Sequence, residues 1–453
     1  MTFEPSRFTE FRYDSADFDR TTGEAAFGFS LVADFSETDS TETFVERVTF
    51  TLPDDPATVD WPRVDALLVL LGSIIGISYY KAAAPERVVI AVDGMTEAGI
   101  AYFSSVLRNG LGEFAYRAGL AGMLNPTVVR EGAAGTPLAA TLIPGGAPLV
   151  PIGGGKDSVV SVESLASVGL EPVQFAVNPN AIIARVAEAS GHPMVSAKRV
   201  LDRHLLELNA DGALNGHVPV TAMNSLAALV QSRLLGLGPV AMSNESSASD
   251  PTLVWNGEPI NHQWSKSLEA ERELVAVIRE QAGLDQAYFS LLRPFSEVRI
   301  ARGYANTSGY DAAIVSCNRA FRLGAGNVGW CGDCDKCRFV FLAFAPYMTR
   351  ERLVGIIGKD MFSDETQLQG YRALLGLDAH KPFECVGEEA ECSVAMSIVS
   401  RQEHWASTPI VRALREEIPS LDVGDPIMEA EVMGESEAEA LTGQYERARH
   451  ALV

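Results

Sequence analysis

A glycine-rich turn joins an apolar strand to an amphipathic helix near the middle of the chain. Gly153–Ser158 (GGGKDS) follows the apolar segment Leu149–Ile152 and precedes Val159–Val168, which has the spacing of a helix. Three consecutive glycines can adopt backbone angles that other residues avoid, and they let a ligand approach the main chain. The unpaired N–H groups at a helix start attract anions. With the charge of Lys156 and the hydroxyl of Ser158, these features predict a phosphate-binding loop.

The segments that follow this loop alternate between strand and helix. Strands are predicted over Pro172–Val177 and Pro239–Ser243, and helices over Ile182–Ala189 and Thr221–Leu235. This order predicts a parallel sheet with helices on both faces. Ser243-Asn244-Glu245 comes at the carboxyl end of a strand, where side chains of such sheets usually face the ligand crevice.

A chain of 453 residues is long enough for two or three domains. We expect an α+β N-terminal domain over residues 1–140, an α/β domain with the glycine loop over 141–345, and a helical, acidic C-terminal region over 346–453. Within the first region, the pattern predicts short strands in the first 50 residues. A buried helix over Trp61–Ile77, a strand over Arg87–Val92 and a second helix over Tyr102–Gly119 are predicted to follow. Thr136–Pro148 is rich in Gly and Pro and is interpreted as a linker.

Charge and composition favour a cytoplasmic protein that acts on a small molecule. The formal net charge is -23, which disfavours nonspecific binding to a nucleic-acid backbone. The N-terminus lacks the apolar core of a signal peptide, and the longest apolar run, Ala66–Ile77, is too short to span a bilayer. Six cysteines in a chain of this length do not form a disulfide scaffold. We therefore expect no nucleic-acid partner and no membrane partner.

Three of these cysteines lie in one tight turn. The segment Cys331-Gly-Asp-Cys334-Asp-Lys-Cys337 is joined by Cys317 upstream, and four thiolates at such spacing suit tetrahedral zinc in a structural role. An iron–sulfur cluster is the weaker alternative. The third alternative is a turn that carries cysteines without any metal.

The glycine loop departs from the two common nucleotide-binding motifs. The Walker pattern needs Ser or Thr directly after the Lys, where this chain has Asp157. The dinucleotide fingerprint needs a third glycine where this chain has Ser158. The segment instead resembles the SGGxDS loop of the N-type ATP pyrophosphatases, the PP-loop superfamily, through Gly154, Gly155, Asp157 and Ser158, with Gly153 in place of the first Ser. The alternative is a glycine-rich turn that binds nothing.

Over nearly its whole length the chain resembles a bacterial family within that superfamily, the UDP-N-acetylmuramoyl-L-alanyl-L-glutamate epimerases. The segments that carry the resemblance are Phe11-Arg12-Tyr13, Ser78–Ala82 (SYYKA), the GGGKDS loop, Trp330–Lys336 (WCGDCDK) and Pro382–Gly387 (PFECVG). The resemblance implies a parallel-sheet PP-loop (adenine nucleotide alpha hydrolase-like) domain. It also implies an ATP-dependent inversion of the terminal L-Glu of a peptidoglycan precursor through an acyl-adenylate, with release of AMP and pyrophosphate.

The resemblance assigns expected roles to individual residues. ATP and Mg²⁺ are the implied cofactors: Gly153, Gly154 and Gly155 would approach the phosphates, Lys156 and Ser158 would hold them, and Asp157 would help to place Mg²⁺. Inversion needs one group to remove a proton and another to return one. Cys385, Glu384 and His262 are the candidates, the first two in the loop Lys381–Gly387 and the third in Asn261–Lys266 (NHQWSK). A buried apolar role for Cys385 and a helix cap for Asn261–Lys266 are the competing interpretations.

Two other functions remain open at this level. One is another adenylating PP-loop enzyme, such as a small-acid ligase, an amide or nitrile synthetase, or a tRNA thiolase. The other is a nucleotide sensor without catalysis. The negative charge argues against tRNA as a substrate but not against a small acid.

Overall fold

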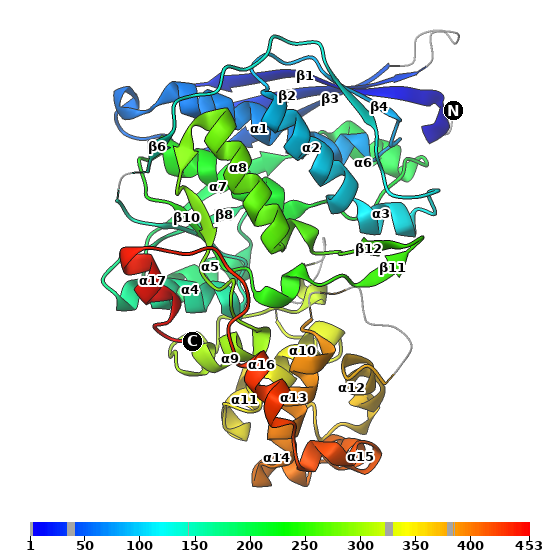
Figure 1. The fold of residues 1–453 in the computed structure, drawn as a ribbon, viewed down its shortest axis with the longest axis vertical. Coiled ribbons are helices and arrows are strands. Elements are labelled where there is room, and N and C mark those ends of the chain that lie inside the picture. The colour runs from blue at the N-terminus through cyan, green and yellow to red at the C-terminus, as the bar shows by residue number, and fades with distance from the viewer. Residues whose placement is uncertain (1–2, 34–40, 144, 322–328, 378–383, 385) are drawn as a thin grey trace.

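One long sheet runs through most of the protein (Figure 1). The computed structural model describes residues 3–33, 41–143, 145–321, 329–377, 384 and 386–453. From one edge to the other, the ten strands are β14 (Tyr288–Ser290), β10 (Val240–Met242), β7 (Leu149–Pro151), β8 (Val173–Val177), β9 (Met194–Val200), β3 (Thr41–Thr49), β2 (Glu24–Ala33), β1 (Phe8–Asp19), β4 (Arg87–Ile90) and β5 (Thr127–Arg130). Neighbours are parallel except at β9–β3, β3–β2 and β2–β1. The chain is therefore an α/β protein with a mostly parallel sheet.

The N-terminal strands pack against a buried helix. Alternate residues of β2, including Phe27, Phe29 and Leu31, are almost fully buried, as the period-two pattern predicts. Helix α1 (Trp61–Tyr80) begins with a proline in its first turn and packs on this face. A Cβ added at Gly72 or Gly76 would collide with side chains of β1 and β2, so these glycines allow helix and sheet to approach closely.

Helix α1 is also the part of the described chain that is long and apolar enough to cross a membrane by length and composition. The apolar run 66–77 lies within this 20-residue helix, and the prediction that it belongs to a buried helix is confirmed. In this structure 67% of its most apolar stretch is buried inside the protein, between the sheet and the helices α7 (Val220–Leu234) and α8 (Leu268–Ala282).

The middle of the chain is wound as the alternating pattern predicts. Helix α4 (Lys156–Ser167) follows β7, α5 (Ala181–Ser190) follows β8, and α7 precedes β10. Taken in chain order, the strands β7, β8 and β9 extend to one side, and β10 and β14 are added on the other side of β7. The direction of winding therefore reverses between β7 and β10, and sheets of this type bind ligands at such a point.

Several predicted elements differ from the structure. The predicted helix Tyr102–Gly119 is divided at Leu111 into α2 (Glu97–Gly110) and α3 (Gly112–Arg117), because glycines flank the break. The predicted linker Thr136–Pro148 contains β6 (Thr141–Leu142), which pairs with β13 (Leu284–Asp285). Among the elements that were not predicted are β9, α6 (Arg203–Ala210) and the hairpin of β11 (Leu253–Trp255) and β12 (Glu258–Ile260).

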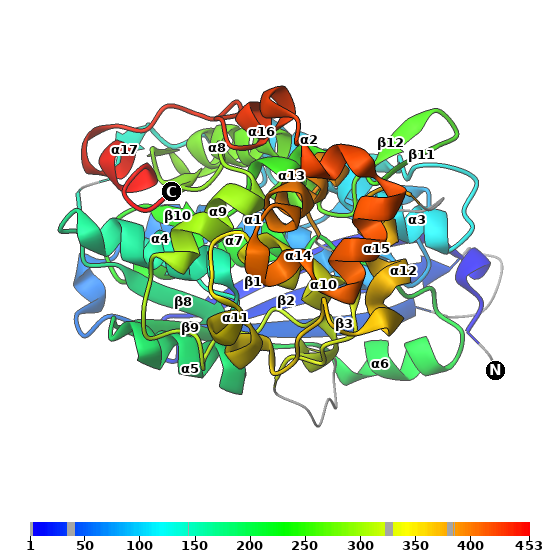
Figure 2. The ribbon, with the colours of Figure 1, turned by 90° about the horizontal axis from the view of Figure 1, so that it is seen from below.

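The C-terminal part is helical, as predicted, and forms a second core below the sheet (Figures 1 and 2). Aromatic rings in edge-to-face contact, among them Phe341, Phe362 and Trp405, lie in this core. Its helices are α9 (Glu297–Ala305), α10 (Asp335–Phe344), α11 (Arg350–Ile357), α12 (Leu368–Leu374), α13 (Glu389–Ser400), α14 (Glu403–Ala406), α15 (Pro409–Glu417) and α16 (Pro426–Val432).

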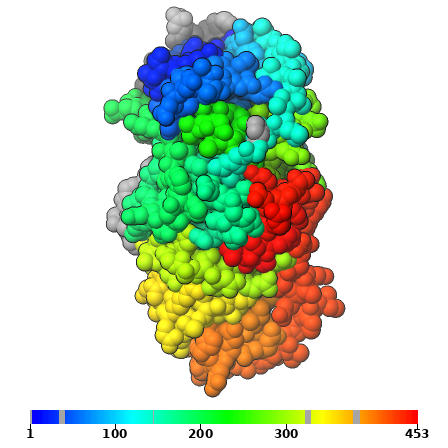
Figure 3. All heavy atoms as spheres, turned by 90° about the vertical axis from the view of Figure 1, so that its left-hand side faces the viewer, coloured from blue at the N-terminus to red at the C-terminus, as the bar shows by residue number. Residues whose placement is uncertain are grey.

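The last helix, α17 (Gly443–Arg449), returns to the α/β part and packs beside α4. The space-filling view shows this C-terminal segment on the surface next to the middle of the chain (Figure 3). The sheet itself is continuous across residue 140, because β3 pairs with β9. The division of the chain at residues 140 and 345 into separate domains stays a prediction.

Candidate active site

The glycine loop lies at the reversal point of the sheet. Gly154 has a φ of +85°, and a Cβ there would lie 2.8 Å from Cγ2 of Ile182. A Cβ at Gly155 would lie 2.7 Å from Oγ of Ser316, whereas no atom of the described residues lies within 4 Å of the Cβ position of Gly153. The loop before α4 is therefore a tight turn that favours glycine at Gly154 and Gly155. No side chain caps the first N–H groups of α4 within the described structure, and uncapped groups of this kind can bind an anion.

The strand next to this loop ends in three polar residues. Ser243, Asn244 and Glu245 follow β10 directly, and Oγ of Ser243 lies 2.7 Å from Oγ of Ser161 on α4. Asn244 and Glu245 are buried. The segment therefore stands beside the glycine loop, in the position that the order of elements predicts.

A cluster of paired charges lies at the start of α4. Nζ of Lys156, which is 2% exposed, forms ion pairs with the carboxylates of Asp157 and Glu297. Nζ of Lys336 lies 3.4 Å from the other oxygen of Glu297. Burial alone would lower the pKa of Lys156, but the two carboxylates outweigh it and raise the pKa. Burial would raise the pKa of Glu297, but Lys156 and Lys336 outweigh it and lower the pKa, so that Lys156 and Glu297 are both held in their charged forms.

Asp157 is the member of this cluster that a ligand can reach. Its side chain is 29% exposed, against 3% for Glu297. Its pKa is raised by loss of solvent and by the neighbouring charges of Glu297 and Glu245, which outweigh the attraction of Lys156. A divalent cation would relieve this repulsion, and carboxylate oxygens are the ligands that Mg²⁺ prefers. The hydroxyl of Ser158 donates to the carbonyl of Gly155 at 3.3 Å, within the first turn of α4.

Glu391 supports the same cluster from the helical part. Its two carboxyl oxygens accept hydrogen bonds from the backbone N–H groups of Glu297 and Glu388, both at 3.0 Å. Burial and the charge of Glu297 raise its pKa to about 8. The sequence analysis missed both Glu297 and Glu391. For Glu391 a signal was available in the sequence, because its spacing from Glu388 is that of a capping box, which the two residues form at the start of α13.

A buried ion pair fixes the loops around the cluster. Arg293, which is 1% exposed, donates to Oε2 of Glu271 at 2.8 Å and to the carbonyl oxygens of Glu245 and Lys266 at 2.7 and 2.6 Å. Glu271 in turn accepts from the backbone N–H of Ser290 at 2.9 Å. One guanidinium thus ties together segments that follow β10 and precede α8.

The four predicted cysteine ligands come together. Their ligand atoms lie within 4.8 Å of one another, and three Sγ–Sγ distances are 3.9 Å (Cys317–Cys334), 3.8 Å (Cys331–Cys337) and 3.5 Å (Cys334–Cys337). A tetrahedron with zinc–sulfur bonds of about 2.3 Å has edges of about 3.8 Å, so the sulfurs are spaced for a single tetrahedral ion. A four-iron cluster would hold each sulfur on a separate iron atom and hence farther apart. The cluster is part of the loop that leads into α10 and Lys336.

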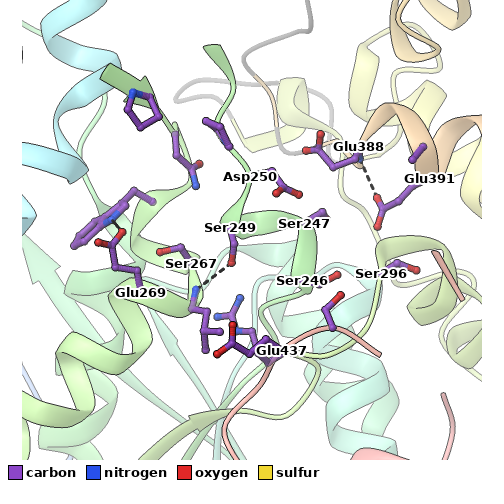
Figure 4. Close-up of a pocket in the computed structure, with 18 of the residues that line it drawn as sticks. Ser246, Ser247, Ser249, Asp250, Ser267, Glu269, Ser296, Glu388, Glu391 and Glu437 are labelled. Atoms are coloured by element: carbon purple, nitrogen blue, oxygen red, sulfur yellow. Dashed lines mark hydrogen bonds between the residues drawn. The ribbon is translucent and has the colours of Figure 1, made fainter. Parts of the chain in front are cut away.

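Two cavities adjoin these charges. The first, which we call the acidic cavity, has a volume of about 960 Å³ and is lined by serines and by seven acidic side chains (Figure 4). These acidic side chains belong to Asp250, Glu269, Glu273, Glu388, Glu391, Glu431 and Glu437, and all except Glu391, whose pKa is raised to about 8, are taken as negative charges. Its two arginines are already paired, Arg293 with Glu271 and Arg272 with Glu437 and Glu439. The cavity is therefore unfavourable for an anion.

The second cavity, the histidine cavity, has a volume of about 460 Å³. Two predicted catalytic residues, His262 and Glu384, line it together with Lys266 and His217. Nδ1 of His262 lies 2.7 Å from Oγ1 of Thr252. Oε2 of Glu384 accepts from the backbone N–H of Lys336 at 3.3 Å, and burial raises its pKa.

The structure thus places Glu384 and His262 around one space, while the third candidate, Cys385, lies outside the described residues. Their catalytic roles stay predictions. The segment Trp264–Lys266 forms a short 3-10 turn before α8, and Ser267 caps that helix. His217 was not predicted, because its segment Asn215–Pro219 carries no motif.

The fold and the site define an α/β protein with an uncapped helix start and a cluster of paired charges at the reversal point of its sheet. The family model of the MurL N-terminal domain matches residues 2–291, and that of the MurL C-terminal domain matches residues 313–428. The chain therefore belongs to the MurL family. No solved structure matches it at a significant level.

Curated relatives agree with this membership. The proteins of Micromonospora sp. and Salinispora tropica are 49% and 48% identical to the chain over 416 residues, which cover 91% of it and 92% and 90% of the relatives. The protein of Xanthomonas oryzae pv. oryzae is 38% identical over 99% of the chain and 98% of its own length. All three are named UDP-N-acetyl-alpha-D-muramoyl-L-alanyl-L-glutamate epimerase. Such relatives make the chain an enzyme of the isomerase class.

Proposed function

We propose that the chain is an ATP- and Mg²⁺-dependent epimerase that inverts the terminal L-Glu of UDP-N-acetylmuramoyl-L-Ala-L-Glu through an acyl-adenylate. The substrate is taken from the names of the relatives. The adenylating route, and with it membership of the PP-loop superfamily, is our inference from the glycine loop. We place the reaction in the cytoplasm, among the soluble precursors of peptidoglycan.

The charged cluster at the start of α4 is the observation that carries this proposal. Uncapped N–H groups and the ammonium of Lys156 converge where a phosphate chain would lie, and Lys336 adds a second ammonium. Asp157 offers an accessible carboxylate beside the buried Glu297 and Glu245, a donor set that fits Mg²⁺. In this arrangement the acidic side chains would bind the cation, and Lys156 and the helix start would bind the anion.

The chemistry of the substrate explains why ATP is needed. The nitrogen of the terminal glutamate is already in a peptide bond, so pyridoxal phosphate cannot form a Schiff base with it. Removing its α-proton beside a free carboxylate would add negative charge to negative charge. Conversion of that carboxylate to a mixed anhydride with AMP makes the α-proton much more acidic. After inversion, water releases the D-glutamyl product and AMP.

The proton transfers require groups on opposite faces of the α-carbon. Glu384 and His262 line the histidine cavity, which is joined to the charged cluster through Lys266 and through the backbone of Lys336. We keep both as candidates for the proton-transfer pair, with Cys385 as the third.

We also propose that the four cysteines hold one structural zinc ion. All four ligand positions would be filled by protein, so the ion would not act as a Lewis acid. Its function would be to fix the loop before α10, which carries Lys336 towards Glu297.

The test is the stoichiometry of nucleotide products. The purified enzyme, given the L,L-substrate and Mg²⁺-ATP, should form AMP and pyrophosphate in parallel with D-glutamate. Asp157→Ala should abolish turnover without loss of fold, whereas the control Asp54→Ala, in an exposed loop, should have no effect. Formation of ADP and phosphate, or epimerisation without ATP, would exclude the adenylating route.

A further inference from the structure

We propose that the histidine cavity receives the acidic terminal residue of the substrate and that His217 is one of the two groups that exchange its α-proton. The inference rests on the proposed function and adds a catalytic residue to it. It is based on the charges of the two cavities, on the way the His217 loop is held, and on a carboxylate beside the imidazole.

The distribution of charge favours the histidine cavity for an anionic ligand. The acidic cavity presents seven acidic side chains, one of which, Glu391, has its pKa raised to about 8, and two arginines that are already paired. The histidine cavity presents Lys266 and two histidines against the two carboxylates of Glu113 and Glu384. In a chain with a net charge of -23, this is the less repulsive of the two spaces for a substrate that carries a dicarboxylic residue and a diphosphate. The histidine cavity also lies next to the charged cluster, because Lys266 lines the cavity and Lys336 donates its backbone N–H to Glu384, and both lysines lower the pKa of Glu297.

A buried lysine holds the loop that carries His217. Lys81 ends α1 within the SYYKA segment, is 6% exposed, and donates to Oδ1 of Asn215 at 2.5 Å and to the carbonyl of Gly216 at 3.1 Å. Both acceptors directly precede His217. Resemblance was the only reason to note this segment in the sequence. Its contacts now show that Lys81 anchors one wall of the cavity.

The imidazole is oriented by a carboxylate. Nδ1 of His217 lies 3.3 Å from Oε2 of Glu113, which is itself 10% exposed and paired through its other oxygen with Arg117 at 2.6 Å. A carboxylate at Nδ1 selects the tautomer that carries its proton there and leaves Nε2 as the base. The His217 side chain is 31% exposed and lines the cavity, so a substrate can reach the ring.

The groups around His217 keep it neutral. Burial lowers its pKa, and the charges of Lys81 and Arg117 lower it further, against the opposing effect of Glu113. A neutral imidazole is the form that can accept a proton at physiological pH.

The step balances without any further reactant. Nε2 of His217 takes the α-proton of the activated glutamyl residue, and the electron pair of the broken C–H bond moves into the activated carboxyl group. A second group, on the opposite wall of the cavity, donates a proton to the other face of the α-carbon, which inverts the centre. The imidazolium then returns its proton to solvent, and the second group regains one.

His217→Gln is the decisive variant, because glutamine retains a polar side chain but cannot act as a base. In D₂O with substrate and Mg²⁺-ATP, we expect deuterium incorporation and D-glutamate formation to fall by at least about 100-fold. AMP formation should stay within about threefold of the parent enzyme. Glu113→Gln, which removes only the partner, should show a smaller loss in kcat with little change in KM.

A matched control exists in a second histidine–glutamate pair. Nε2 of His204 lies 2.6 Å from Oε2 of Glu42, outside both cavities, so His204→Gln should leave both rates unchanged. Normal deuterium exchange in His217→Gln, or equal loss of AMP formation and exchange in a folded variant, would overturn the assignment of His217. If the parent enzyme exchanges deuterium without forming AMP, the proposed adenylation step is wrong. Loss of deuterium exchange in His217→Gln would even then assign the proton transfer to His217.

Discussion

Replacement of Arg293 by methionine should be among the most destabilising single changes in the α/β part. The guanidinium is 1% exposed and donates to one carboxylate and two backbone carbonyls. Methionine fills a similar volume but leaves Glu271, whose side chain is 3% exposed, as an unpaired buried charge. Breaking a buried pair in this way costs about 3–5 kcal/mol of unfolding free energy.

The pair itself contributes less than this loss suggests, and a double-mutant cycle separates the two quantities. Glu271→Gln removes the charge but leaves an oxygen that can accept from the N–H of Ser290. The double variant Arg293→Met/Glu271→Gln should therefore be more stable than the sum of the single changes predicts, with a coupling of about 2 kcal/mol or more. The remaining loss reflects the carbonyls of Glu245 and Lys266, which no longer have their donor.

Urea denaturation followed by circular dichroism measures these free energies. Arg272 with Glu437 is the control pair, because their side chains are 47% and 72% exposed and its loss should cost at most about 1 kcal/mol. Additivity of the two buried changes within about 0.5 kcal/mol would refute the reasoning. Unchanged AMP formation in Arg293→Met would further show that the segments it joins do not shape the nucleotide site.

Two further predictions concern the metal and a buried acid. The purified protein should contain close to one zinc per chain by elemental analysis. Cys334→Ser should lose the zinc and unfold at a lower temperature, whereas the control Cys392→Ala, at a buried cysteine outside the cluster, should retain the zinc. Absence of metal from the parent protein would exclude the site. The pKa of Glu391 in the folded protein is about 8, above its ordinary value. The contribution of this side chain to the free energy of unfolding is therefore fully present below the pKa of the unfolded state and is lost as the pH rises towards 8. Unfolding free energy should therefore fall by a few kcal/mol more in the parent than in Glu391→Gln between pH 5 and pH 8, and parallel curves would contradict the assignment.

Local patterns predicted the elements that flank the glycine loop. The order strand, GGGKDS, helix is visible in the sequence because glycine and the helix start act within a few residues. The grouping of the cysteines was also predicted: spacing places three of the thiols in one turn, and Cys317, which was expected as the fourth, is brought beside them by the fold. The strand β9 escaped prediction because its residues are mostly half-buried or exposed and give a weak alternation.

The charge partners could not be predicted, because tertiary contacts create them. Glu297 is 141 positions from Lys156, and Glu113 is 104 positions before His217, so no spacing rule connects them. His217 is a lone histidine in a loop, and its position beside Glu113 and near Lys81 depends on the packing of α1 and α3. Such residues become candidates only when burial and distance are known.

The antiparallel junction between β3 and β9 has a consequence for motion. Three residue pairs and the buried ion pair of Arg199 with Glu46 cross it, so a hinge between the two halves of the sheet would have to break both. The wall with Glu113 and His217 is therefore rigidly fixed to the half that carries the glycine loop. Asn318 and Glu384, which also line the histidine cavity, lie instead on the segments around the helical part. We therefore expect any movement that opens or closes this cavity to displace the helical part and to leave the sheet unchanged.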